Sequence, residues 1–130
     1  MNSALTYTGS HYTSFMHETK VTLSNGSELH VEIGGQPEHT VSMLIMGLGA
    51  QMLFWPDFFC KSLIDQGYRV IRFDNRDIGL SSKIRHSGPR LNTFKLMGRF
   101  ALGLGNQGAP YNLYDMAEDA ALLIEHLGLE

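Results

Sequence analysis

Residues 41–49 read VSMLIMGLG, a nearly continuous apolar run that ends in a glycine-containing turn. Runs of this length bounded by glycine are typical of strands that are buried on both faces of a parallel sheet. Apolar residues then recur at helical spacing over 54–64, where Pro56 suits the first helical turn and Gly67 suits the residue after the last. Another apolar strand is predicted at 69–73. Because the connections are short, this strand–helix–strand unit predicts two parallel strands joined by a right-handed crossover.

The segments on either side add a hairpin and a final helix. Apolar and polar residues alternate over 20–33 around Asn25-Gly26, and glycine supplies the positive φ that such a turn needs, so a β-hairpin is predicted. A helix is predicted over 113–127, with Asn112 as its N-cap. Its apolar face is expected to comprise Leu113, Met116, Ala117, Ala120, Ile124 and Leu127. Residues 74–110 are expected to be irregular, apart from a short helix near 93–102.

These elements predict an α/β fold in one domain, residues 18–130, preceded by a loose leader at 1–17. The final helix ends close to the last residue, whereas a fold that alternates strands and helices continues from such a helix into another strand. The sheet is therefore expected to be truncated within this sequence.

Composition narrows the class of protein. The chain has 130 residues, of which 43% are hydrophobic and 18% charged, with a net charge of −3, which fits one globular domain and excludes collagen-like, disordered and disulfide-framework classes. No apolar run is long enough to span a bilayer, and the single cysteine, Cys60, is typical of a cytoplasmic protein. The basic stretch at 83–99 lacks interleaved aromatic residues, so nucleic-acid binding is not expected. No histidine pair has metal-ligand spacing, and neither a metal nor a cofactor is expected.

The turn at Gly47-Leu48-Gly49 is the main candidate for a functional site. Backbone N–H groups between a strand and a helix start can bind negative charge. Two kinds of protein use this arrangement: dinucleotide folds and enzymes that stabilise an oxyanion. Asp74, at the end of the next strand, supports the dinucleotide interpretation. Against it, Met52 occupies the position of the third glycine in the G-x-G-x-x-G fingerprint of dinucleotide folds. Residues 103–108, GLGNQG, match that fingerprint in letters, yet no convincing strand precedes them.

Several segments resemble the amino-terminal part of α/β-hydrolases. The run through Gly49, followed by Trp55-Pro56-Asp57, resembles the third strand of that family and its loop. Residues 74–81, DNRDIGLS, resemble the D-x-R-x-x-G-x-S loop after the fourth strand, and 111–130 resemble the helix before the nucleophile strand. The resemblance runs from about residue 18 to 130 and is nearest to esterase-like members with Met-Gly in place of His-Gly. It implies an antiparallel hairpin followed by parallel strands with crossover helices.

The resemblance also implies roles for individual residues. The backbone N–H of Leu48 matches the first oxyanion-hole donor, and Gly47, Gly49 and Trp55 are possible pocket-lining residues. The residues expected to fix the conformation of the loop after the fourth strand are Asp74, Arg76, Asp77, Gly79 and Ser81.

The catalytic groups of the family are absent from these 130 residues. No G-x-S-x-G motif occurs, so the nucleophile, the acid and the histidine are expected beyond Glu130. The whole protein is expected to be a serine hydrolase acting on a small-molecule carboxylic ester, and this chain alone is expected to be inactive. In the strand order of the family, Val41–Met46 becomes an open edge that another chain can pair with. A homodimer or higher oligomer is therefore expected. The alternative to a role in a hydrolase is a non-catalytic, self-associating interaction module.

Overall fold

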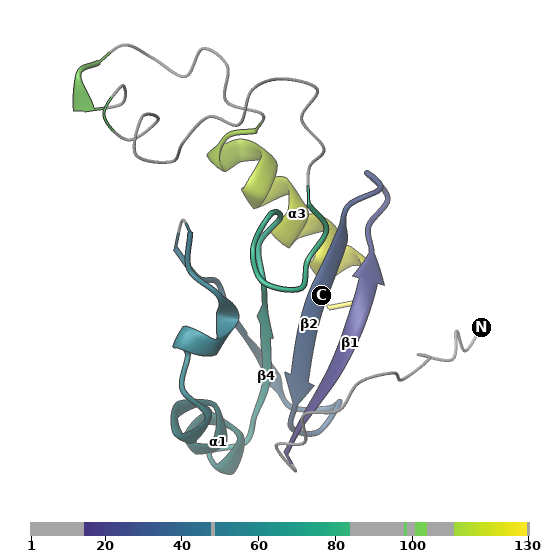
Figure 1. Ribbon diagram of the computed structural model, residues 1–130. Helices are drawn as coiled ribbons and strands as arrows, with labels where there is room; N and C mark the ends of the chain where they lie inside the picture. Colours follow the sequence, from purple (N-terminus) through teal and green to yellow (C-terminus); the bar gives the residue numbers. More distant parts are fainter. Residues whose placement is uncertain (1–14, 48, 84–97, 99–100, 104–110, 130) are drawn as a thin grey trace.

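The computed structural model describes residues 15–47, 49–83, 98, 101–103 and 111–129. In chain order the elements are β1 (Met16–Thr22), β2 (Glu28–Gly34), β3 (Thr40–Leu44), the 3₁₀ helix η1 (Met52–Phe54), α1 (Asp57–Asp65), β4 (Tyr68–Phe73) and α3 (Leu113–His126). The strands form one mixed sheet in the order β1-β2-β4-β3 (Figure 1). The predicted combination of an antiparallel hairpin and a parallel strand–helix–strand unit is confirmed.

The hairpin has the predicted turn. β1 and β2 pair antiparallel, from Met16 opposite Gly34 to Thr22 opposite Glu28. Gly26 has φ of 85°, a conformation that costs glycine little. β1 begins at Met16, within the segment that the sequence assigns to the leader, and residues 1–14 lie outside the described part of the chain.

The parallel unit is formed by β3, α1 and β4. β3 and β4 pair in parallel from Thr40 opposite Tyr68 to Leu44 opposite Arg72, and β4 also pairs antiparallel with β2. α1 ends where Gly67 adopts φ of 86° and donates its N–H to the Ile64 carbonyl at 2.9 Å. The helix is shorter at its start than predicted, since η1 precedes it and Pro56 is the N-cap of α1.

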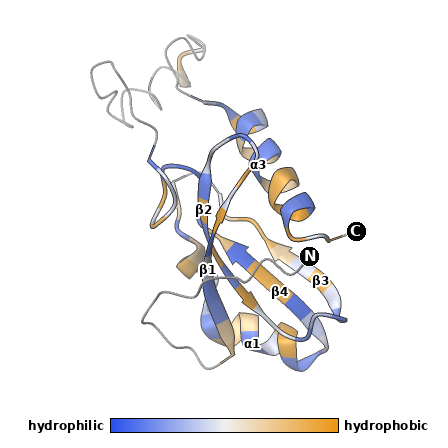
Figure 2. Ribbon diagram, turned by 90° about the vertical axis from the view of Figure 1, so that its right-hand side faces the viewer, coloured by the Kyte–Doolittle hydropathy of each residue, from blue (hydrophilic) through white to orange (hydrophobic). Residues whose placement is uncertain are grey.

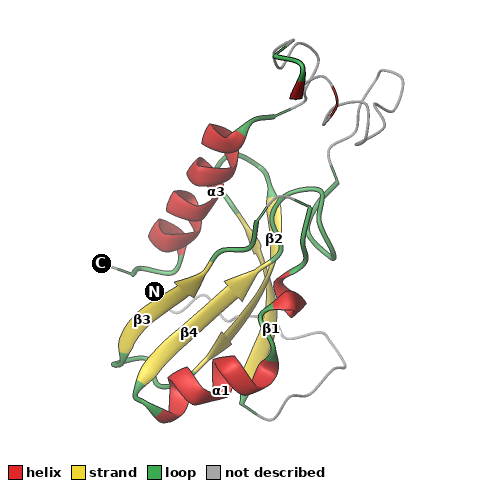
Figure 3. Ribbon diagram, turned by 90° about the vertical axis from the view of Figure 1, so that its left-hand side faces the viewer, coloured by secondary structure: helices red, strands yellow, loops and turns green. Residues whose placement is uncertain are grey.

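The two helices cover opposite faces of the sheet (Figure 3). β4 carries both hydrophobic and hydrophilic bands (Figure 2), and its successive side chains point to opposite faces of the sheet. Ile71 and Phe73 pack with Leu123 of α3, whereas Val70 packs with Cys60 of α1. The sheet therefore has an apolar core on each side.

Two predictions of burial are wrong. The apolar run at 41–46 is not a strand buried on both faces: β3 ends at Leu44, which is its only buried residue, and Ile45 is 53% exposed. The reason is that β3 is the outer strand and pairs, within the described residues, with β4 alone.

The buried face of α3 also differs from the predicted one. Asp119, Ala120 and Leu123 are buried, whereas Leu113 is 71% exposed and Ile124 is 39% exposed. A buried ion pair of Asp119 turns this face toward the sheet, as described below. Among the described residues, no helix combines the length and hydrophobicity needed to cross a membrane.

Candidate functional site

A turn follows the carboxyl end of β3 and is held by side chains of the segment that follows β4. We call residues 46–52 the glycine turn. The Asn75 side-chain amide donates to the Met46 carbonyl at 2.9 Å, and the Met52 N–H donates to Asp74 Oδ1 at 2.8 Å. Both ends of the glycine turn are therefore bonded to two consecutive residues. Leu48, the predicted oxyanion donor, lies outside the described residues.

The glycines of this turn are open to their surroundings. Gly47 and Gly49 are exposed, and a Cβ atom at either position would meet no described atom within 4 Å. Gly49 has φ of 78°, so a larger residue there would be strained. Within the described part of the chain, no atom therefore fills the space that a side chain would take at either glycine.

The segment that bonds the glycine turn is itself tied to β2. We call residues 74–83 the acidic-basic loop. Ser81 Oγ donates to the Asp74 carbonyl at 2.5 Å and accepts the His30 N–H at 2.9 Å. Ser82 exchanges two further hydrogen bonds with Glu28, through its N–H at 2.7 Å and its Oγ at 3.1 Å. The serine hydroxyls thus connect strand and loop, and neither resembles a free nucleophile.

Two residues of the acidic-basic loop have left-handed backbone conformations. Gly79 has φ of 51°, and a Cβ there would lie 2.1 Å from Asp74 Oδ2, so the Asp74 carboxylate occupies the space a side chain would need. Asp77 has φ of 66° and donates its N–H to the Ser82 carbonyl at 3.0 Å. The pKa of Tyr111 is raised by burial, then by the charge of Asp77 and a hydrogen bond to it.

Arg76 joins the acidic-basic loop to α3. Its Nε and Nη2 donate to the two oxygens of Asp119 at 2.6 and 2.7 Å, a bidentate pair in which Asp119 is almost fully buried. The guanidinium also lies 5.5 Å from the ring centroid of Tyr111. Asn25 of the hairpin turn donates to Asp119 as well, at 2.9 Å. This pair fixes the side of α3 that faces the sheet.

Asp74 is the most connected of the predicted loop residues. Its carboxylate accepts from the N–H groups of Met52 and Leu80 and contacts His30 Nδ1 at 3.3 Å. The other ring nitrogen of His30 is bonded to Glu18 of β1. Burial alone lowers the pKa of His30, but hydrogen bonds to Asp74 and Glu18 outweigh it, and the net shift is upward.

The ionisation of Asp74 follows the same logic. Burial acts to raise its pKa, but the hydrogen bonds from His30, Met52 and Leu80 lower it below its ordinary value. Asp74 is therefore an ionised acceptor, not a proton donor.

Sequence reasoning missed three residues of this region: His30, Asn75 and Arg72. Arg72 is 1% exposed and donates to Glu32 at 2.7 Å and to Asp57 of α1 at 2.7 Å, and to the Trp55 carbonyl. For His30 and Arg72 the available signal was a charged or imidazole side chain within a predicted strand, because such residues stay buried only when they are paired.

Comparison with solved structures shows which fold the chain has. No protein-family profile matches the chain. A putative acyltransferase from Salmonella enterica superposes with a TM-score of 0.65 and 24% identity, covering 92% of this chain and 33% of that one. An epoxide hydrolase of the α/β-hydrolase superfamily, from metagenomes of hot environments, gives 0.64 at 22% identity, covering 87% and 30%. The chain has the fold of the amino-terminal part of an α/β-hydrolase.

A curated protein is similar to this chain over part of its sequence. Rhodomycin D methylesterase DnrP of Streptomyces peucetius is 41% identical over 49 residues, which are 38% of this chain and 16% of that protein. The chain thus spans about one sixth of that relative and about one third of the solved structures.

The position of the glycine turn argues against the dinucleotide interpretation. In a dinucleotide fold the glycines lie at the amino end of the following helix. In this chain η1 intervenes, and α1 begins only at Asp57. The sequence predicted a turn between a strand and a helix that starts at Trp55-Pro56-Asp57, and α1 does begin at Asp57, while the Met52 N–H between them is bonded to Asp74.

Trp55 lies at the end of η1 and packs on α1. Its ring stacks on Phe59 with centroids 5.6 Å apart, and its indole nitrogen is buried without a hydrogen-bond partner among the described residues. Its role in lining a pocket stays a prediction. Cys60 beside it is fully buried, and burial raises the pKa of its thiol, so it is not a reactive nucleophile.

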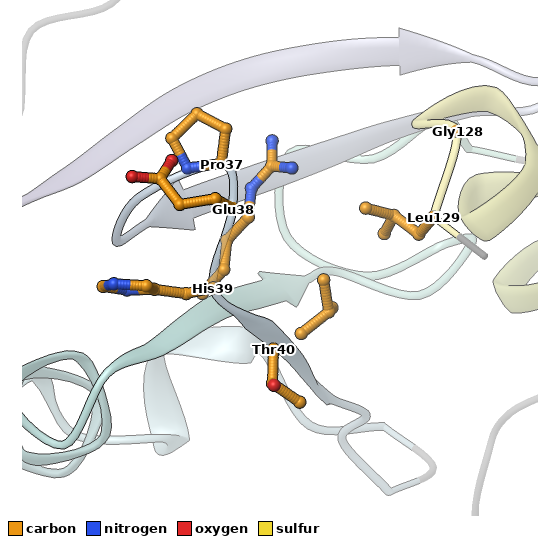
Figure 4. A pocket seen from close by; sticks show the side chains of 8 residues that line it. Pro37, Glu38, His39, Thr40, Gly128 and Leu129 are labelled. Carbon is orange, nitrogen blue, oxygen red and sulfur yellow. The ribbon is translucent and has the colours of Figure 1, made fainter.

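A pocket of about 440 Å³ lies at the opposite end of the sheet from the glycine turn. It is lined by residues before and at the start of β3, by Arg69, and by Gly128 and Leu129 after α3 (Figure 4). Active sites of α/β folds form at the carboxyl ends of parallel strands, so this pocket is not the candidate site. The described residues include no group of three or more His, Cys, Asp or Glu placed to hold a metal ion.

Proposed function

We propose that the whole protein is a serine hydrolase of carboxylic esters and that this chain supplies its oxyanion-binding turn. The observation that carries the proposal is the glycine turn, which follows the carboxyl end of β3 and is bonded at both ends by Asp74 and Asn75. The similarity to a methylesterase over 49 residues supports an ester as the substrate.

The proposed chemistry follows from where charge develops. Attack of a serine hydroxyl on an ester carbonyl places negative charge on the carbonyl oxygen, and backbone N–H donors held in position stabilise that charge. We assign the first donor to the N–H of Leu48. Gly47 and Gly49 leave the approach to it free, and Trp55 is proposed to line the pocket. The nucleophile, its acid and its base are assigned to sequence that these residues do not contain.

The experiment compares two proteins. The 130-residue chain and the full-length protein, which is proposed to contain the G-x-S-x-G motif, the acid and the histidine, are assayed with p-nitrophenyl esters and with methyl esters. We expect hydrolysis only by the longer protein, since loss of the nucleophile costs orders of magnitude in rate. A serine-to-alanine variant of that motif is the control. If the longer protein hydrolyses no ester and the serine does not react with a fluorophosphonate, the proposal is wrong.

A second candidate function is self-association through β3. Within the described residues β3 pairs with β4 alone, and Ile45 after it is 53% exposed. An unpaired apolar edge is a template for another strand. We propose a second copy of the chain as the partner, and a cytoplasmic location in keeping with the single free cysteine, Cys60. Sedimentation is expected to show a dimer that Val41→Lys dissociates; a monodisperse monomer at micromolar concentration contradicts it.

A further inference from the structure

We propose that Asn75 is a positioning residue of the hydrolase: its side-chain amide holds the Met46 carbonyl and thereby sets the orientation of the Met46–Gly47 peptide, with which the proposed oxyanion turn begins. The inference rests on the proposed function, because it assigns a role in the same oxyanion site. Nothing in the resemblance to the D-x-R-x-x-G-x-S pattern requires it, since Asn75 occupies a variable position of that pattern.

The first support is the softness of the glycine turn. Gly47 and Gly49 have no side chains that pack against described residues, and Gly49 already adopts a left-handed conformation. Glycine has more backbone freedom than any other residue, so side-chain packing does not fix this backbone. Its conformation is set instead by hydrogen bonds: those to Asp74 and Asn75 at its two ends and one inside it, from the Ala50 N–H to the Gly47 carbonyl at 3.3 Å.

The second support is the rigidity of the group that makes the bond. Asn75 is 2% exposed, and its carbonyl accepts the Ile78 N–H at 3.0 Å in a tight turn. Its neighbour Asp74 is held through its carboxylate by His30, Met52 and Leu80, as described above. A donor built on so constrained a backbone can transmit its position to Met46.

The third support is chemical. The Met46 carbonyl is an acceptor, and the amide of asparagine is a neutral donor of the right length. An aspartate in its place has nearly the same shape but donates only when it is protonated. Asn75→Asp therefore tests the hydrogen bond itself, with little change in volume.

The experiment uses the full-length hydrolase with three variants: Asn75→Ala, Asn75→Asp and, as a matched control, Asn112→Ala. Asn112 caps α3 far along the chain from the glycine turn and accepts bonds from Tyr114 and Asp115, so its loss lowers stability without touching the turn. We expect Asn75→Ala to lower kcat about 10- to 100-fold with KM within about twofold, because a misplaced donor weakens transition-state binding. Asn112→Ala is expected to keep the wild-type kcat.

The pH profile of Asn75→Asp separates positioning from a merely structural role. Burial against a carbonyl raises the pKa of the new carboxyl, which becomes a donor when protonated. The ratio of its kcat to the wild-type value is therefore expected to rise as the pH falls from about 8 to about 5, whereas the ratio for Asn75→Ala stays flat. Flat ratios for both variants, or a kcat for Asn75→Ala equal to that of Asn112→Ala, overturn the proposal.

A spectroscopic measurement tests this inference independently of the proposed function. Labelling with ¹³C-carbonyl methionine and ¹⁵N-glycine marks the Met46-Gly47 peptide, and within these 130 residues the only other such peptide is Met97-Gly98, an internal reference. We expect Asn75→Ala to shift the Met46 carbonyl resonance and leave that of Met97 unchanged. An unshifted Met46 signal overturns the inference even if the protein is an esterase. A shifted signal in a protein without esterase activity upholds the hydrogen bond and refutes only the function.

Discussion

Replacing Gly79 by alanine is expected to destabilise the protein more than the same change at a left-handed glycine whose added Cβ meets no described atom. Gly79 has φ of 51°, and its added Cβ would lie 2.1 Å from Asp74 Oδ2 and 2.5 Å from the carboxyl carbon. The Asp74 carboxylate cannot simply rotate away, because it accepts hydrogen bonds from Met52 and Leu80. The substitution must therefore break at least one of these bonds or move the backbone of the loop.

The magnitude follows from two contributions. A non-glycine residue in the left-handed region costs about 1–2 kcal/mol. A lost hydrogen bond to a charged acceptor costs about 1.5–3 kcal/mol. For Gly79→Ala we therefore expect a decrease in the free energy of unfolding of about 3–5 kcal/mol, a large part of the net stability of a typical domain.

The matched control is Gly26→Ala. Gly26 has φ of 85°, but a Cβ there meets nothing within 4 Å among the described residues, so this variant carries the backbone strain alone. Urea denaturation of both variants gives the two decreases in unfolding free energy. The difference between them isolates the clash with Asp74 and is expected to be about 2–3 kcal/mol. Equal decreases for the two variants would refute the argument that the Asp74 carboxylate is fixed in place.

Three further predictions concern the same network. Gly47→Ala is expected to change the free energy of unfolding by less than about 0.5 kcal/mol, since its Cβ meets no described atom, yet to lower kcat/KM for esters about tenfold in the full-length protein. Because the pKa of His30 is raised in the folded state, its stabilisation is fully present below the unfolded pKa and is lost as the pH rises through the folded pKa. The difference in unfolding free energy between wild type and His30→Gln should therefore shrink as the pH is raised above the ordinary histidine pKa of about 6.5, and a constant difference contradicts this. Arg76→Ala should cost about 3 kcal/mol or more, because it leaves the buried Asp119 carboxylate without its charged partner. Lys61→Ala, which removes an exposed pair, should cost less than about 1 kcal/mol in the same urea titrations.

The order of the elements could be predicted because it depends on signals that are local in the sequence. The Asn25-Gly26 turn specifies a hairpin, and Gly67 marks the end of α1, since both positions need a positive φ. Asn112 marks the start of α3 through a capping box that involves Asp115. Each of these signals lies within a few residues of the structure it determines.

The burial of side chains was harder to predict because it depends on partners distant in the sequence. The hydrophobic pattern placed Ile124 of α3 on its buried face, but Asp119 lies there instead, because Arg76 is 43 residues away in sequence and binds it with two hydrogen bonds. Likewise, the run at 41–46 has the composition of a central strand, and its position as the outer strand of the described sheet is a property of the topology.

In the candidate site, too, local signals could be predicted and contacts between distant residues could not. The sequence pattern indicated Asp74 and Gly79 as parts of one loop, yet it carried no sign that Asp74 and Asn75 bond the two ends of the glycine turn, which precedes them by more than 20 residues. Substitutions of Asp74 will confuse stability with function, because its carboxylate also joins His30 of β2 and Leu80. Within the part of the chain that the structure describes, the Asn75 side chain bonds to the Met46 carbonyl and to no other group of the network, so Asn75 is the position at which the conformation of the turn can be changed while the bonds of Asp74 stay intact.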